Sequence, residues 1–150
     1  METSVALIIA KTLSPTLRFI RLTEPVACVF WQDYFNWNLA QPDNQSGIHA
    51  LVKVHEQNAG GATQVLFTSD DLYIMQRLGA GDQKGLVLVL NNRGTWNGTW
   101  VQTRWNNTRL VPAAWRGRDD LNTPEEKWTN ESGWVDLWAG PRGYTVYVPA

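Results

Sequence analysis

After Gly61 the sequence consists of short runs of β-forming residues separated by turn residues. This alternation constrains the fold more than any other feature. The breaks are clusters of Asp, Asn and Gly, which favour turns because they tolerate the backbone angles that tight reversals need. Regular spacing of this kind is typical of an antiparallel β-sandwich. The expected strands lie within residues 62–69, 72–78, 85–92, 98–105, 133–139 and 143–149.

Two segments of this region have distinct characters. Residues 86–90, LVLVL, are apolar on both faces, which predicts the central strand of a sheet. Residues 112–127 are polar and charged, which predicts an excursion between strands. The fold class is therefore mainly β.

The segment before Gly61 has a different pattern. Residues 26–31, VACVFW, are apolar on both faces like a buried parallel strand, and a polar loop follows them. Residues 48–58 then place Ile48, Leu51, Val52 and His55 at i, i+3, i+4 and i+7, which predicts a helix with one apolar stripe. The chain thus carries one strand-helix unit ahead of its sheet.

The bulk composition excludes several classes of protein. A chain of 150 residues suits one compact unit, whereas a full barrel of eight strand-helix units typically needs about 250. Thirteen basic residues balance 14 acidic ones without a basic cluster, so nucleic acid is not an expected partner. Cys28 is the only cysteine, which excludes an internal disulfide. The apolar run at residues 5–10 follows Glu2 and falls short of a membrane span, so we expect a soluble chain without a signal peptide or membrane partner.

Three separated motifs give the chain a family resemblance. They are CVFWQDYFNWNLAQPDNQSGIHALVKVHEQNAGG, DDLYIMQRLGAGDQKGLVLVLNNRG and GYTVYVP. In this order they resemble the carboxyl-terminal part of a bacterial-type α-amylase of the retaining glycoside hydrolase family 13. The resemblance implies that residues 26–61 are the last strand and helix of a (β/α)8 barrel and that residues 62–150 are the Greek-key β-sandwich called domain C. Residues 1–25 match nothing expected there.

The resemblance also implies that the catalytic carboxylates are missing. A retaining glycosidase needs two carboxyl groups about 5–5.5 Å apart, and the family's three catalytic acids precede the matching region. We therefore expect a non-catalytic, carbohydrate-associated module that binds α-glucan or another polysaccharide. One alternative is a glycoside hydrolase, active alone or within an assembled enzyme, for which Asp33 is the candidate. Another is a truncated structural fragment without specific function.

Metal binding and self-association are two further expectations. Calcium is common in the family, and Asp70, Asp71 and Asp82 are the candidate ligands here, but Gln64 stands where an acid is wanted, so we predict no cofactor. Without barrel neighbours, the strand at 26–31 has to be covered by the N-terminal segment or by a second chain, which makes a homodimer an option.

Nine tryptophans supply the candidate sugar-binding residues. In residues 133–139, Val135 and Leu137 alternate with Trp134, Asp136 and Trp138, so inward-facing aliphatic residues would leave both indoles and a carboxylate on the outer face. At about 3.3 Å per residue the two rings lie roughly 13 Å apart, a spacing that suits a glucan chain. The alternative is that residues 112–127 or the helix cover this face.

The other candidates lie outside that strand. In residues 98–105, Trp100 and Trp105 differ by an odd number, so a regular strand places one in the core and one outside. Trp37 and Trp96 are expected in loops, where an exposed indole has fewer structural roles. The predicted substrate-binding residues are thus Trp37, Trp96, Trp100, Trp134, Asp136 and Trp138.

Overall fold

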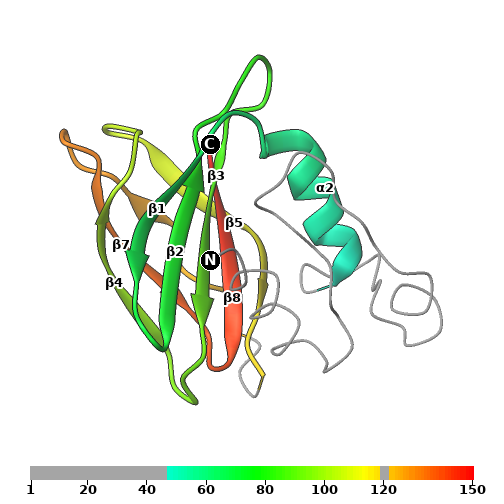
Figure 1. Cartoon of the computed structure of the whole chain (residues 1–150), viewed down its shortest axis with the longest axis vertical. Coiled ribbons are helices and arrows are strands. Elements are labelled where there is room, and N and C mark those ends of the chain that lie inside the picture. Colours follow the sequence, from blue (N-terminus) through cyan, green and yellow to red (C-terminus); the bar gives the residue numbers. More distant parts are fainter. Residues whose placement is uncertain (1–46, 119–121) are drawn as a thin grey trace.

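A computed structural model describes residues 47–118 and 122–150. It contains the helix α2 and eight strands, coloured along the sequence in Figure 1. The expected strand at 26–31, the N-terminal segment and the homodimer expectation that depends on them lie outside the described residues. The elements are α2 (Ile48–Asn58), β1 (Thr63–Thr68), β2 (Leu72–Arg77), β3 (Leu86–Asn91), β4 (Asn97–Gln102), β5 (Arg109–Arg116), β6 (Lys127–Trp128), β7 (Trp134–Ala139) and β8 (Gly143–Pro149).

The strands form two antiparallel sheets, as the punctuation of the sequence predicts. The larger sheet has the order β1-β2-β3-β8-β5-β6, and the smaller one pairs β4 with β7. In Figure 1 the larger sheet stands between α2 on one side and the β4–β7 pair on the other. The fold is therefore a β-sandwich with a single described helix packed on its outside.

The strand β3 is central in this arrangement because it contributes to both cores. Leu86, Leu88 and Leu90 pack in the cluster that includes α2. Val87 and Val89 point the other way, into the cluster between the two sheets. A strand buried on both faces has to be apolar throughout, which is why LVLVL was recognisable as the central strand.

The helix α2 has the predicted bounds and buries one face. Ile48, Leu51 and His55 of the expected stripe are buried, whereas Val52 is only half-buried. The buried face also includes Ala50 and Val54, so its centre lies on the side of the helix away from Val52. The part of the chain that the structure describes has no helix of the length and apolarity that a bilayer crossing requires.

The excursion predicted over residues 112–127 is shorter than expected. Residues 112–116 belong to β5, which pairs with β8, and Lys127 starts β6. Pro112 is tolerated inside β5 because the register shifts between Pro112 and Ala114, and a bulge does not require the ladder hydrogen bond that proline cannot donate. Residues 117–126 are therefore what remains of the segment between β5 and β6.

The strand expected over residues 98–105 also ends early. β4 stops at Gln102, and the next residue, Thr103, is buried with its hydroxyl 3.1 Å from the carbonyl oxygen of Gly133. Trp105 therefore lies in the following loop rather than in the strand. It nevertheless packs against the core between the sheets, while Trp100 is exposed, so the two indoles face different surroundings as expected.

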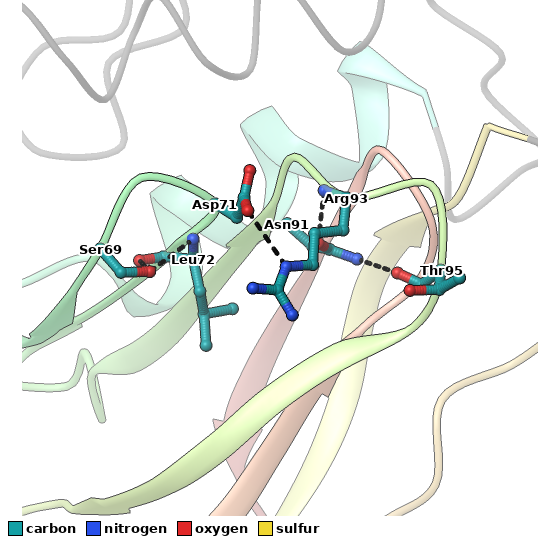
Figure 2. A network of polar contacts seen from close by, with 6 residues as sticks. All are labelled: Ser69, Asp71, Leu72, Asn91, Arg93 and Thr95. Atoms are coloured by element: carbon teal, nitrogen blue, oxygen red, sulfur yellow. Dashed lines mark hydrogen bonds and ion pairs between the residues drawn. The ribbon is translucent and has the colours of Figure 1, made fainter.

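One polar cluster ties the loops together at one end of the sandwich (Figure 2). The side chain of Asn91, fully buried at the end of β3, donates to the carbonyl oxygens of Thr95 (2.8 Å), Ala139 (3.2 Å) and Gly140 (2.9 Å). Its Oδ1 accepts the backbone N–H of Arg93 at 2.8 Å. Asn91 thus fixes the end of β7 to the loop that leads into β4.

Candidate functional site

The outer face of β7 carries the residues that the alternation predicts. Val135 and Leu137 are almost fully buried, at 1% and 0% exposure, and pack between the sheets. Trp134 and Trp138 are 43% and 38% exposed on the opposite face, with Asp136 half-buried between them. The strand therefore has one core face and one aromatic face.

The pairing of β4 with β7 adds a third tryptophan to this face. Trp100 lies directly opposite Asp136, and Gln102 lies opposite Trp134. Directly opposed residues of an antiparallel pair project to the same side of the sheet. Trp100 is 62% exposed. We call Trp100, Gln102, Trp134, Asp136 and Trp138 the tryptophan face.

A glycine makes room for one of the rings. Gly98 lies opposite Trp138, and a Cβ atom placed on Gly98 would lie 2.7 Å from Cγ and Cδ2 of the Trp138 ring. The same Cβ would also clash with the carbonyl oxygen of Leu137. The Trp138 ring therefore lies against the backbone of β4, a position that any side chain at residue 98 would obstruct.

Asp136 accepts two hydrogen bonds at the centre of the face. Its Oδ2 accepts the indole N–H of Trp138 at 3.1 Å and the Lys127 ammonium at 3.3 Å. The Lys127 ammonium also lies 3.3 Å from Oε2 of Glu125. Lys127 is 16% exposed and Asp136 is 35% exposed, so this pair is more sheltered than an ordinary surface ion pair.

The backbone of Trp138 is fixed by a hydrogen bond from the larger sheet. The hydroxyl of Tyr147, whose side chain is buried, donates to the carbonyl oxygen of Trp138 at 3.2 Å. Burial raises the pKa of Tyr147 well above its usual value, so the hydroxyl remains a donor throughout the ordinary pH range. On the neighbouring strand, the Gln102 amide donates to the carbonyl oxygen of Ser132 at 2.8 Å.

Within residues 47–118 and 122–150, the indoles of the tryptophan face stay exposed beside the segments that could have concealed them. The helix α2 packs on the opposite side of the larger sheet (Figure 1). Lys127 of β6 reaches the face through its contact with Asp136, and Glu125, just before β6, pairs with Lys127. The exposed fractions of the three indoles show that their rings remain accessible.

The other predicted tryptophans do not join this group. Trp96 is half-buried in the loop before β4, with its Cζ2 3.7 Å from the position of a Cβ on Gly140. Trp37 lies outside the described residues, as does Asp33. Trp128 in β6 is 66% exposed, but it neighbours Lys127, which points to Asp136, so Trp128 projects to the opposite side of its strand.

Of the three aspartates considered for calcium, Asp82 is separated from Asp70 and Asp71 by the length of β2. Asp70 and Asp71 lie in the turn before β2, where the Asp71 carboxylate is 3.1 Å from the Arg93 guanidinium (Figure 2). Asp82 lies beyond the other end of β2, in the loop before β3. Within residues 47–118 and 122–150, no three His, Cys, Asp or Glu side chains are grouped so as to hold a metal ion.

A hollow of about 490 Å³ lies away from the tryptophan face, beside the β2–β3 loop. Its walls include Lys84, Arg104, Trp105, Thr108 and Pro149, and the Arg104 guanidinium lies 6.0 Å from the centre of the Trp105 ring. Its lining offers no carboxylate side chain among the described residues, whereas a retaining glycosidase needs two.

The residues predicted from the sequence to bind substrate did not include Gly98, Gln102 or Lys127. No local signal identified them, because their roles depend on which strands become neighbours. Gly98 and Gln102 matter only once β4 pairs with β7, and Lys127 only once β6 lies beside β7.

Comparison with known proteins agrees with the fold. Residues 86–148 match the family model described as alpha-amylase C-terminal, and the β-sandwich is consistent with that match. The resemblance to the carboxyl-terminal part of an α-amylase is therefore confirmed. No curated protein sequence matches the chain.

Two solved structures illustrate the likeness. The γ-CGTase of alkalophilic Bacillus clarkii superposes with a TM-score of 0.52 and 23% identity, covering 67% of this chain and 15% of that one. An Anoxybacillus α-amylase superposes with a TM-score of 0.50 and 14% identity, covering 67% and 21%. This chain thus spans only about a fifth or less of the length of these enzymes, and the likeness is one of fold alone.

Proposed function

We propose that this chain is a non-catalytic carbohydrate-associated module that binds α-glucan weakly through the tryptophan face. The observation that carries the proposal is the convergence of three exposed indoles around one carboxylate on a single sheet face. Pyranose rings present C–H groups that stack on indole faces, while their hydroxyls need polar partners. Gln102 and Lys127 supply polar groups beside the rings.

The choice of α-glucan follows from the family resemblance. Domains of this fold occur in an α-amylase and in a γ-CGTase, and the resemblance to an α-amylase implies an α-glucan as the ligand. With about 1–1.5 kcal/mol for each of three stacked rings, the binding free energy is about 4 kcal/mol, which corresponds to a Kd of about 1 mM. Such affinity suits a module that adds to the binding of a larger assembly.

Titration of tryptophan fluorescence with maltooligosaccharides and soluble starch tests the proposal. We expect saturable quenching with a Kd near 1 mM, and no comparable response to cellulose or xylan oligosaccharides. Trp100→Ala and Trp134→Ala should each weaken binding about five- to tenfold, since each removes one stacking ring.

Trp128→Ala is the matched control, because Trp128 is equally exposed but lies away from the face. It should leave the affinity unchanged. Quenching that is lost equally in Trp128→Ala and Trp100→Ala would contradict the proposed site, and equal binding of xylan would contradict the proposed ligand.

A further inference from the structure

The hydrogen bonds of Asp136 point to a role that differs from direct contact with a ligand. We propose that Asp136 is a positioning residue, whose carboxylate holds the Trp138 indole against β4 and so prepares the tryptophan face for a sugar ring. This inference rests on the proposed function and deepens it. Asp136 Oδ2 accepts both the Trp138 N–H and the Lys127 ammonium, so this oxygen is engaged by groups of the protein itself.

Trp138 is constrained at three points. Its backbone carbonyl accepts from Tyr147, its ring lies against Gly98, and its N–H donates to Asp136. The first two contacts fix the backbone and leave space for the ring. Of the three contacts, the hydrogen bond to Asp136 is the one that acts on the indole N–H, and it therefore favours one orientation of the ring about its side-chain torsions.

Lys127 orients the carboxylate in turn. The ammonium lies 3.3 Å from the same Oδ2 that accepts the indole N–H, and it is itself mostly buried. A hydrogen bond to a charged acceptor is stronger than one between neutral groups. The two contacts, from Lys127 to Asp136 and from Asp136 to Trp138, therefore link β6 to the exposed Trp138 ring of β7.

The expected effect follows from the side-chain rotamers. A tryptophan side chain has three staggered χ1 wells, so without Asp136 the binding orientation would be populated about one third of the time. The apparent Kd increases by the inverse of that fraction, which gives about a threefold loss of affinity. Freedom about χ2 raises the loss to about sixfold.

A double-mutant cycle tests the proposal in the full chain. Asp136→Ala should weaken maltooligosaccharide binding three- to sixfold in the wild-type background. It should have no effect in a Trp138→Phe background, because phenylalanine keeps an aromatic ring but has no N–H to orient. Asp136→Asn, which retains an acceptor oxygen, should recover most of the affinity lost in Asp136→Ala.

Hydrogen exchange of the indole N–H groups gives a second readout that requires no ligand. In ¹⁵N-labelled protein the Trp138 N–H should exchange more slowly than that of Trp100, which is more exposed. Asp136→Ala should speed exchange at Trp138 and leave Trp100 unchanged. Glu125→Gln is the control, because Glu125 is 85% exposed and its carboxylate pairs with the Lys127 ammonium rather than with the indole N–H.

The two readouts separate failure of this inference from failure of the proposed function. An equal loss of affinity from Asp136→Ala in both backgrounds would show that Asp136 contacts the sugar directly, and unchanged exchange at Trp138 would show that it does not hold the ring. Either result overturns the positioning role. If no variant, including the wild type, binds any glucan, the proposed function fails, and the exchange experiment still decides whether Asp136 orients Trp138.

Discussion

Removal of the Asn91 side chain should unfold the sandwich at a markedly lower temperature. Asn91 is fully buried, and its amide serves three carbonyl oxygens while its own oxygen accepts a backbone N–H. An asparagine amide has two N–H donors, so the three carbonyls share them, and Asn91→Ala removes the equivalent of three hydrogen bonds. At about 1 kcal/mol each, the free energy of unfolding should fall by about 3 kcal/mol.

For a chain of this size such a loss lowers Tm by about 6–12 °C. Urea unfolding followed by circular dichroism gives the free energy, and calorimetry gives Tm. Asn91→Asp should be worse than Asn91→Ala, because a carboxylate cannot donate to the carbonyls and would be a buried, unpaired charge.

Asn92→Ala is the matched control. Asn92 is the next residue in the chain, its side chain is exposed, and its backbone N–H donates to the carbonyl oxygen of Asp71, a hydrogen bond that alanine keeps. It should change the free energy of unfolding by less than about 0.5 kcal/mol. If Asn91→Ala and Asn92→Ala were equally stable, the network in Figure 2 would contribute nothing and the reasoning would be refuted.

Two further predictions concern Gly98 in β4 and two buried tyrosines in β8. Gly98→Ala should destabilise the protein by about 1–3 kcal/mol and weaken glucan binding, because the new methyl group meets the Trp138 ring. Gly94→Ala is the control, since the space around Gly94 is open, and it should change neither property. Calorimetry measures the stability and fluorescence titration measures the binding. Above about pH 10 the protein should lose stability, because burial raises the pKa of Tyr144 and Tyr147, so the unfolded chain releases their protons first. Stability is fully present below the unfolded pKa and falls by about 1.4 kcal/mol per pH unit for each tyrosine, so a Tyr147→Phe variant whose unfolding had the same pH slope as the wild type would exclude this cause.

The orientation of the β7 side chains could be predicted because it is a local property. Successive side chains of a strand point to opposite faces, so buried Val135 and Leu137 require Trp134 and Trp138 to face outward. The central position of β3 was predictable for a similar reason, since its residues are apolar on both faces.

The errors of sequence interpretation came from interactions that override local preference. Proline and charged residues marked 112–127 as an excursion, yet the pairing of β5 with β8 accommodates Pro112 at a register shift. Trp105 was assigned to a strand by its β-forming neighbours, but the chain turns after Gln102 and places the indole against the core from a loop.

The sequence by itself determined that this chain forms an antiparallel sandwich with an outward row of indoles on β7, because turn chemistry and side-chain alternation act over a few residues. The tertiary structure alone decided that Trp100 joins that row, that Gly98 gives Trp138 its place and that Lys127 reaches Asp136. These contacts join strands far apart in the chain, and the pairing is selected by how well the two cores pack, a cooperative property that no short stretch of sequence encodes.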